Sequence, residues 1–139
     1  MLKEDDTILI AVTGRGADLA VLDLMNRIEK EYPYSELKAL VIDEEIPGYS
    51  EKHVEAAIKH LEELEVEYTI RKLGKARDCA ECRDKKVRLM IEEGKRVNAD
   101  KIVITSCLED ITAEIIHSLT RGNEKRIKML YGNKIWGKD

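Results

Sequence analysis

The chain has 139 residues, of which 43% are hydrophobic and 37% are charged, and its net charge is -4. These values are those of one globular domain, and no apolar run approaches the roughly 20 residues that a membrane-spanning helix needs. The mild charge argues against a protein that binds duplex nucleic acid over a wholly basic surface. The segment Met1–Asp6 lacks the apolar core of a signal peptide, so we expect a single cytoplasmic domain over residues 1–139.

Two strand–helix units are predicted in the first half of the chain. Thr7–Val12 is an apolar, β-branched run that predicts a buried strand. Apolar residues at helical spacing follow it, with Asp18 as the expected N-cap and Pro33 as the end of the helix. A second strand is expected over Leu37–Ile42, and the helix after it should be capped by Ser50.

The same alternation continues in the second half. A strand over Val66–Arg71 leads into a polar loop, Leu73–Cys82, and a helix. A strand over Lys101–Thr105 and a helix over Glu109–Thr120 come next, and Ile127–Tyr131 is a candidate fifth strand. Strands that alternate with helices of about 10 to 15 residues predict βαβ units. The expected fold is therefore an α/β three-layer α/β/α sandwich with a mostly parallel, Rossmann-like sheet.

In such sheets ligands bind beyond the carboxyl ends of the strands, where the strand order reverses. Four features of this sequence follow strand ends: Thr13–Asp18, Asp43, the loop that carries Cys79, and Ser106–Asp110. The sequence therefore predicts a functional site at this rim of the sheet.

The first of these features is a Gly-x-Gly turn. Gly14 and Gly16 would let backbone N–H groups at a helix start surround a phosphate. The turn is not a Walker loop, because no Gly-Lys-Ser/Thr follows it. The alternative is an ordinary flexible turn, and Asp18 favours it, since a carboxylate at a helix start takes the place of a bound anion.

The three cysteines suggest metal or thiol chemistry. Cys79 and Cys82 stand at a helix entrance with the spacing that lets two thiolates reach one metal ion or cluster. A thioredoxin-type redox pair fits less well, because that motif follows the first strand of its fold. Cys107 leaves the fourth strand at the same rim, so three thiolates could hold an iron–sulfur cluster with one open iron, or a zinc ion. The alternative for Cys107 is a small buried apolar side chain.

Several segments, in this order along the chain, match a known pattern. Ala11–Ala20 reads AVTGRGADLA, Val41–Ser50 is a strand with a glycine-containing loop, and Cys79–Arg83 reads CAECR before a helix and an ADKI strand. Ser106–Asp110 reads SCLED, and Leu119–Asn123 reads LTRGN. These resemble the A-V-S-G-G-x-D-S-L-A, C-x-x-C-G, H-N-L-D-D and L-x-R-G-D signatures of the PP-loop ATPases that thiolate tRNA, in particular their two-cysteine branch. The ordered set covers nearly the whole chain and is more specific than any single motif.

The resemblance implies an adenine nucleotide α-hydrolase-like (HUP) fold and a family chemistry. Family members adenylate a tRNA base with ATP and Mg²⁺ and then deliver sulfur, some of them through a [4Fe–4S] cluster held by three cysteines. It implies a nucleotide site at Thr13, Gly14, Gly16, Asp18 and Asp43. It also implies catalytic roles for Cys79 and Cys82, which with Cys107 would form the metal set for an iron–sulfur cluster or Zn. A tRNA or a sulfur-carrier protein would be the partner.

The sequence also departs from the family pattern. Arg15 stands where the family has its second glycine, Ala17 where it has Asp, and Asp18 where it has Ser, and Ser106-Cys107 replaces His-Asn. Each lost hydrogen-bond donor or charge would cost roughly 1 to 3 kcal/mol of pyrophosphate binding. We therefore expect a degenerate phosphate loop, with a dissociation constant for ATP no tighter than roughly tens of micromolar. The usual third cluster cysteine of the family lies beyond the end of this sequence.

Three functions are compatible with these features. The first is a degenerate PP-loop protein that binds adenine nucleotide weakly and acts in sulfur transfer or tRNA thiolation through Cys79 and Cys82. If catalytic, it would be an ATP-dependent sulfurtransferase. The second is a non-catalytic regulator or partner subunit, such as a homodimer, that binds nucleotide or metal. The third, a universal-stress-type nucleotide binder, fits less well because only the short Arg121–Asn123 segment stands where that family has its phosphate-binding glycines.

Overall fold

The computed structural model describes residues 2–123; residues 1 and 124–139 and the side chains of Cys79, Ala80 and Asp110 lie outside the description. The candidate strand Ile127–Tyr131 is among the residues not described. The chain divides into two compact units, Met1–Thr105 and Ser106–Asp139, which are treated separately. Within residues 2–123, no helix has the length and apolar character needed to cross a bilayer.

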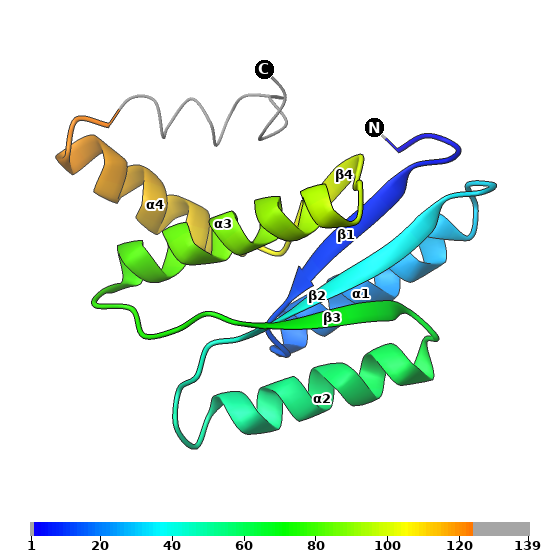
Figure 1. The fold of residues 1–139 in the computed structure, drawn as a ribbon. Coiled ribbons are helices and arrows are strands. Elements are labelled where there is room, and N and C mark those ends of the chain that lie inside the picture. Colours follow the sequence, from blue (N-terminus) through cyan, green and yellow to red (C-terminus); the bar gives the residue numbers. More distant parts are fainter. Residues whose placement is uncertain (1, 124–139) are drawn as a thin grey trace. The chain divides into compact units, whose positions relative to one another are not determined.

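The first unit alternates strands and helices along the chain (Figure 1). In chain order they are β1 (Thr7–Val12), α1 (Gly16–Glu29), β2 (Glu36–Asp43), α2 (Ser50–Glu63), β3 (Glu67–Lys72), α3 (Cys79–Arg96) and β4 (Lys101–Ile104). The strands form one parallel sheet in the order β3-β2-β1-β4. This confirms the predicted α/β fold and the inner position of β1. The chain moves outward from β1 to β3 and then returns to the far side of β1, so the strand order reverses between β1 and β4.

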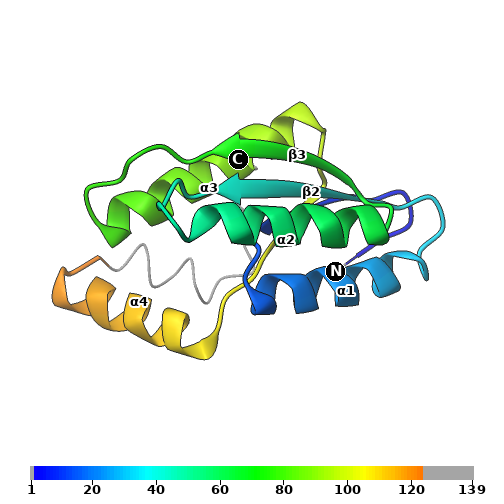
Figure 2. The same cartoon turned by 90° about the horizontal axis from the view of Figure 1, so that it is seen from below.

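Helices cover both faces of this sheet, as the sequence predicts. Alternate residues of β1, including Ile8 and Ile10, pack with α1 and α2, whereas Leu9 packs in a second cluster with Met90 of α3. Figure 2 brings α1 and α2 to the front, with α3 behind the strands. A strand covered on both faces reads as an uninterrupted apolar run, which is why β1 has the sequence TILIAV.

Two of the predicted helix caps are wrong. The N-cap of α1 is Arg15, and Asp18 lies inside the first turn of the helix. The N-cap of α2 is Tyr49, and the hydroxyl of Ser50 instead accepts the backbone N–H of Ile46 at 2.9 Å. Both polar side chains therefore stabilise the loop before the helix through contacts that residue type alone does not reveal.

The described part of the second unit is α4 (Leu108–Thr120) and the turn that ends it. Gly122 has a φ of 64°, and its N–H donates to the carbonyl of Leu119 at 3.1 Å. The N–H of Asn123 donates to the carbonyl of Ser118 at 2.9 Å. These two bonds form a Schellman motif, and they confirm that the Gly-Asn pair ends the helix.

Candidate functional site at the carboxyl end of the sheet

The loop between β1 and α1 is a tight turn that depends on one glycine. Gly14 has a φ of +86°, and a Cβ at this position would lie 1.9 Å from the carbonyl oxygen of His53 in α2. No other residue type fits there without moving the α2 backbone. The predicted role of Gly14 in shaping the loop therefore rests on two independent constraints, its φ and the close approach of α2.

A carboxylate of the protein itself binds inside this turn. Asp18 is 3% exposed, and its Oδ2 accepts the backbone N–H of Thr13 at 2.8 Å and the Thr13 hydroxyl at 2.5 Å. A carboxylate in the first turn of a helix is also favoured by the helix dipole. A phosphate at this helix start would meet the charge of Asp18 and would find both donors of Thr13 already bonded.

The outer side of the loop remains open to solvent. Arg15, Gly16 and Ala17 are all exposed, and a Cβ added at Gly16 would meet no atom within 4 Å. The Nε of Arg15 lies 3.2 Å from the Thr13 hydroxyl oxygen, so its guanidinium stays beside the turn. Exposed N–H groups of the first helical turn and one guanidinium are thus the donors that this loop can offer to an anion.

Asp43, at the end of β2, has a structural role in the loop that follows. Its Oδ1 accepts the N–H of Glu45 at 2.8 Å, and its carbonyl accepts the N–H of Leu73 at 2.8 Å. Glu45 in turn accepts the N–H of Gly74 at 3.1 Å through Oε2. The loops after β2 and β3 are therefore tied together at the rim.

The start of α3 is held by two carboxylates. Asp78 is the N-cap, and its side chain accepts the N–H of Glu81 at 2.8 Å. Glu81 reaches back and accepts both the backbone N–H and the Nε of Arg77, each at 2.9 Å. These hydrogen bonds from Arg77, the backbone bond first, lower the pKa of Glu81 to about 2. The arrangement is a variant of the capping box, and it fixes the backbone on which the cysteine pair stands.

The cysteine pair lies in the first turn of α3. Cys79 is the first residue of the helix, and its side chain is outside the described atoms. Cys82 comes three residues later, so the two positions share one face of the helix. The half-buried side chain of Cys82 packs against the cluster of Leu9, Leu40 and Ile42 on the α3 side of the sheet.

Cys107 belongs to the second unit, where it is the exposed N-cap residue of α4. Among the residues with described side chains, no group of three or more His, Cys, Asp or Glu residues could hold a metal ion. A ligand set made of Cys79, Cys82 and Cys107 therefore stays a prediction.

The chain resembles enzymes that modify tRNA. It is 27% identical, over 99% of its length, to a tRNA-cytidine(32) 2-sulfurtransferase of Vibrio cholerae serotype O1 (strain M66-2). It is 25% identical, over 88% of its length, to a tRNA(Ile)-lysidine synthase of Thermosipho africanus (strain TCF52B). The solved structure of the U34-tRNA thiolase NcsA from Methanococcus maripaludis with its [4Fe-4S] cluster matches 98% of the chain with a TM-score of 0.83 at 22% identity. The chain is thus similar to PP-loop ATPases that modify tRNA.

The motifs of the chain are similar to those of the tRNA-thiolation branch of these ATPases. It spans 44% of the sulfurtransferase, 30% of the lysidine synthase and 49% of the solved thiolase chain. No protein-family model matches the sequence. The chain therefore spans less than half the length of these proteins, and what it shares with the solved thiolase is the α/β fold.

The residues that differ from the PP-loop pattern include both exposed and buried positions of the turn. Arg15 and Ala17, which replace the second glycine and the Asp of the family pattern, are exposed, whereas Asp18, which replaces the Ser, is buried. The change from Ser to Asp is therefore the one that alters the interior of the loop.

Two features of the rim were not predicted from the sequence. The first is the link from Arg77 to Glu81, although the spacing of Asp78 and Glu81 is a readable capping signal. The second is a stack of the Tyr49 and His53 rings, with centroids 4.0 Å apart, at the start of α2. The four-residue spacing of this pair on a helix is the only local signal for it.

Proposed function

We propose that this PP-loop domain acts in sulfur transfer to tRNA, with Cys79 and Cys82 as the pair that carries sulfur or binds metal. The main support is that the ordered motifs run through nearly the whole chain, on the fold of proteins that are named as a tRNA sulfurtransferase and a tRNA thiolase. The two cysteine positions share one face of the α3 start, next to the carboxyl ends of the strands.

The position of the pair suits thiolate chemistry. The positive end of a helix dipole stabilises a thiolate in the first turn, and the thiolate is the form that attacks sulfur and binds metal. Cys79 and Cys82 would supply two ligands to an iron–sulfur cluster or zinc, and Cys107 would supply a third. When bound, such a group would supply a thiophilic metal for the transferred sulfur.

The structure gives less support to a nucleotide-binding role. Thr13, Gly14 and Gly16 would form the cradle for ATP with Mg²⁺, and Asp43 would stand at the end of the next strand. The bond from Thr13 to Asp18 opposes a bound phosphate in the same place. We therefore infer weak adenine-nucleotide binding.

The Asp18 contact also favours a second candidate function. A loop that satisfies its own donors suits a non-catalytic partner subunit that binds nucleotide or metal without turnover. Such a subunit would keep the fold and the cysteine pair but would not release pyrophosphate.

Turnover with a defined tRNA separates the two functions. Anaerobically purified full-length protein is incubated with ATP, Mg²⁺, a sulfide donor and a tRNA transcript, and pyrophosphate release and thionucleosides are measured. Release that depends on tRNA, together with a thionucleoside that the Cys82→Ser variant does not make, supports the first function. ATP binding without release supports the second, and an absence of both ATP binding and thiolation would reject both.

A further inference from the structure

The outer strand β3 leaves one edge of the sheet open. It pairs only with β2, and no other strand of the described residues continues the sheet beyond it. Its side chains alternate between the two faces. The hydroxyl of Tyr68 donates to Glu62 of α2 at 3.2 Å, whereas the Thr69 hydroxyl accepts from Arg96 of α3 at 2.9 Å. Even-numbered residues of β3 therefore face the α2 side, and odd-numbered ones face the α3 side.

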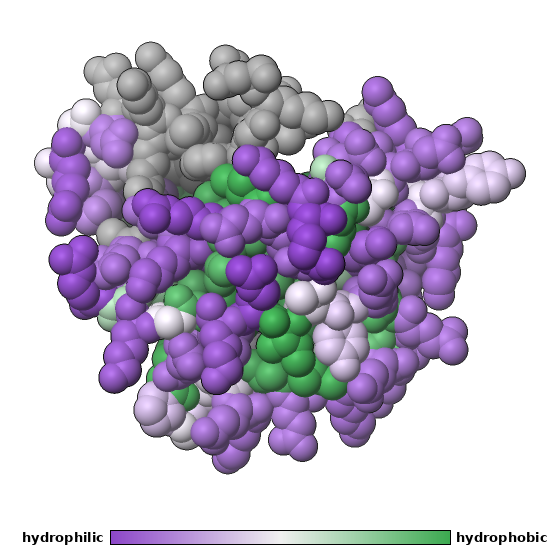
Figure 3. Space-filling model, in the orientation of Figure 1, coloured by the Kyte–Doolittle hydropathy of each residue, from purple (hydrophilic) through white to green (hydrophobic). Residues whose placement is uncertain are grey.

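The α2 side of this edge has an exposed apolar side chain on β3. Ile70 is 44% exposed, and α2 has a shallow hollow lined by Val54 and Ile58 together with the charged residues Glu51, Glu55, Lys59 and Glu62. His60 of the same helix bonds Asp23 of α1 at 3.0 Å, so the hollow lies on the side of α2 that faces away from α1. Figure 3 shows a hydrophobic area over β3 and α2 surrounded by hydrophilic residues. Open strand edges are usually protected from association, so apolar surface at one is informative.

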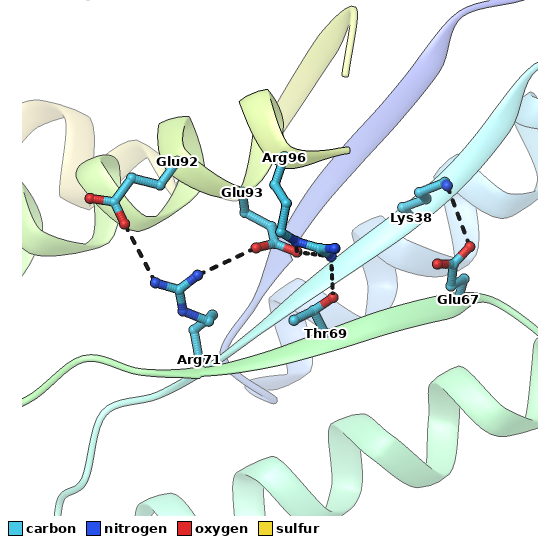
Figure 4. Close-up of polar contacts among 7 residues, drawn as sticks. All are labelled: Lys38, Glu67, Thr69, Arg71, Glu92, Glu93 and Arg96. Atoms are coloured by element: carbon cyan, nitrogen blue, oxygen red, sulfur yellow. Dashed lines mark hydrogen bonds and ion pairs between the residues drawn. The ribbon is translucent and has the colours of Figure 1, made fainter. Parts of the chain in front are cut away.

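The α3 side of the edge carries charges of alternating sign. Glu67 pairs with Lys38 of β2 at 3.4 Å. Arg71 pairs with Glu92 at 3.4 Å and with Glu93 at 3.6 Å, both on α3 (Figure 4). Arg71 comes four positions after Glu67, so the two stand on the same face of the strand with Thr69 midway between them.

We propose that β3 pairs antiparallel with β3 of a second copy of this chain, about a two-fold axis at Thr69. In this register Thr69 lies opposite Thr69, Ile70 opposite Tyr68, and Arg71 opposite Glu67 of the other copy. Threonine pairs, aromatic with β-branched pairs and opposite-charge pairs are three kinds of cross-strand neighbour that stabilise antiparallel strands. The two-fold axis makes the last two pairs occur twice.

The charged side would have one like-charge approach at the axis, because Arg96 bonds Thr69 in each copy; each of these guanidiniums is held by Glu93 of its own chain. Glu67 of one copy, which pairs with Lys38 of its own β2, would meet Arg71 of the other, which already pairs with Glu92 and Glu93. The apolar side would cover Ile70 and Tyr68 and bring the hollows of the two α2 helices towards each other. The alternative is that these charges prevent strand pairing and keep the protein monomeric. The experiment must distinguish this role from dimer formation.

Oligomeric state under a charge reversal tests the proposal. Sedimentation velocity of the full-length protein over a concentration series should show a monomer–dimer equilibrium. Glu67→Lys would place a cation opposite Arg71 twice, and it should raise the dimer dissociation constant roughly tenfold or more. Glu36→Lys is the matched control, because Glu36 also pairs with Lys38, at 3.5 Å, and is also exposed, but lies on β2. That control should stay within roughly threefold of the unmodified protein.

Mixing two variants tests the pairing independently of folding. Glu67→Lys and Arg71→Glu should each dimerise poorly alone, whereas an equimolar mixture should form a heterodimer, since each reversed charge then meets its opposite. Thermal unfolding of each variant shows whether it is folded. An unmodified protein that stays monomeric, or a dimer that Glu67→Lys does not weaken, would overturn the proposal.

The register has its own test. Directly opposed residues of antiparallel strands have Cα atoms about 4.5 to 5.5 Å apart, which a disulfide can span. Thr69→Cys should therefore give a dimer that is crosslinked under oxidising conditions, whereas Tyr68→Cys and the unmodified protein should not. Equal crosslinking of the three proteins would show that the two-fold axis is not at Thr69.

Discussion

Asp18 accepts two hydrogen bonds from Thr13, one from the backbone N–H at 2.8 Å and one from the hydroxyl at 2.5 Å. The two residues lie at opposite ends of the turn that joins β1 to α1. Since Asp18 is buried, its carboxylate acts as the anion of this helix start. The turn is therefore complete without a bound phosphate, and this limits what a nucleotide can gain there.

Replacing Asp18 should strengthen nucleotide binding. Asp18→Ser restores the residue of the family pattern, removes the competing charge and releases the donors of Thr13. We expect the dissociation constant for ATP to fall about tenfold, which is about 1.4 kcal/mol. Isothermal titration calorimetry checks this, with Asp23→Ser as a control that removes one charge from the same helix at a half-buried position away from the turn. If the two variants bind ATP equally, Asp18 is not what limits affinity.

The two glycines of the turn should differ in their tolerance of alanine. Gly14→Ala combines a φ of +86° with a Cβ 1.9 Å from the His53 carbonyl oxygen, so we expect a loss of about 2 to 4 kcal/mol of unfolding free energy. Gly16→Ala meets open space at a helix start and should change it by less than about 1 kcal/mol. Urea unfolding measures both. Similar losses of unfolding free energy in the two variants would mean that the α2 backbone at His53 moves at little cost to make room for the added methyl group.

Glu93 should make the stability of the protein depend on acid pH. Its side chain is 1% exposed, and hydrogen bonds from Arg96 hold its pKa below the usual 4.5 despite the burial, which raises it. Because the folded-state pKa is the lower one, the stabilisation is complete above the unfolded value and is lost as the pH falls below 4.5. Glu93→Gln should cost about 1 to 3 kcal/mol at neutral pH, and the difference from the unmodified protein should shrink in acid.

The control for this experiment is the neighbouring carboxylate. Glu92 is exposed and pairs with Arg71 at 3.4 Å. Glu92→Gln should therefore change the unfolding free energy by less than about 1 kcal/mol at any pH. A pH-independent loss in Glu93→Gln would instead indicate that its packing matters and its charge does not.

Most of the fold could be predicted because β1 and β2 are covered on both faces, which imposes apolar runs that alternate with helical periodicity. The ends of strands were less accurate, since pairing sets them and hydrophobicity does not. Glu36 joins β2 because it pairs with Thr7, although it is charged. Val66 is buried but precedes β3, because its N–H bonds the Leu61 carbonyl at the exit of α2.

The candidate site was less predictable than the fold, because its contacts are specific rather than periodic. Asp18 has the residue type of an N-cap, but its contact with Thr13 places it inside the helix. The spacing of Cys79 and Cys82 can be read locally, whereas a third ligand depends on a residue far along the chain. The tie between Glu45 and Gly74 likewise joins loops that follow different strands.

The cysteine pair should behave as a unit in metal binding. Two thiolates one helical turn apart are both needed to hold a thiophilic metal, and a serine hydroxyl is a poor substitute. We expect Cys79→Ser and Cys82→Ser each to abolish bound iron or zinc, and Cys107→Ser to reduce it if Cys107 is the third ligand. Metal content and the absorption spectrum of anaerobically purified protein measure this. Arg88→Ser, an exposed change in the same helix, controls for the substitution itself. Protein that contains no metal, or cysteine variants that retain it, would show that Cys79 and Cys82 do not form a metal site.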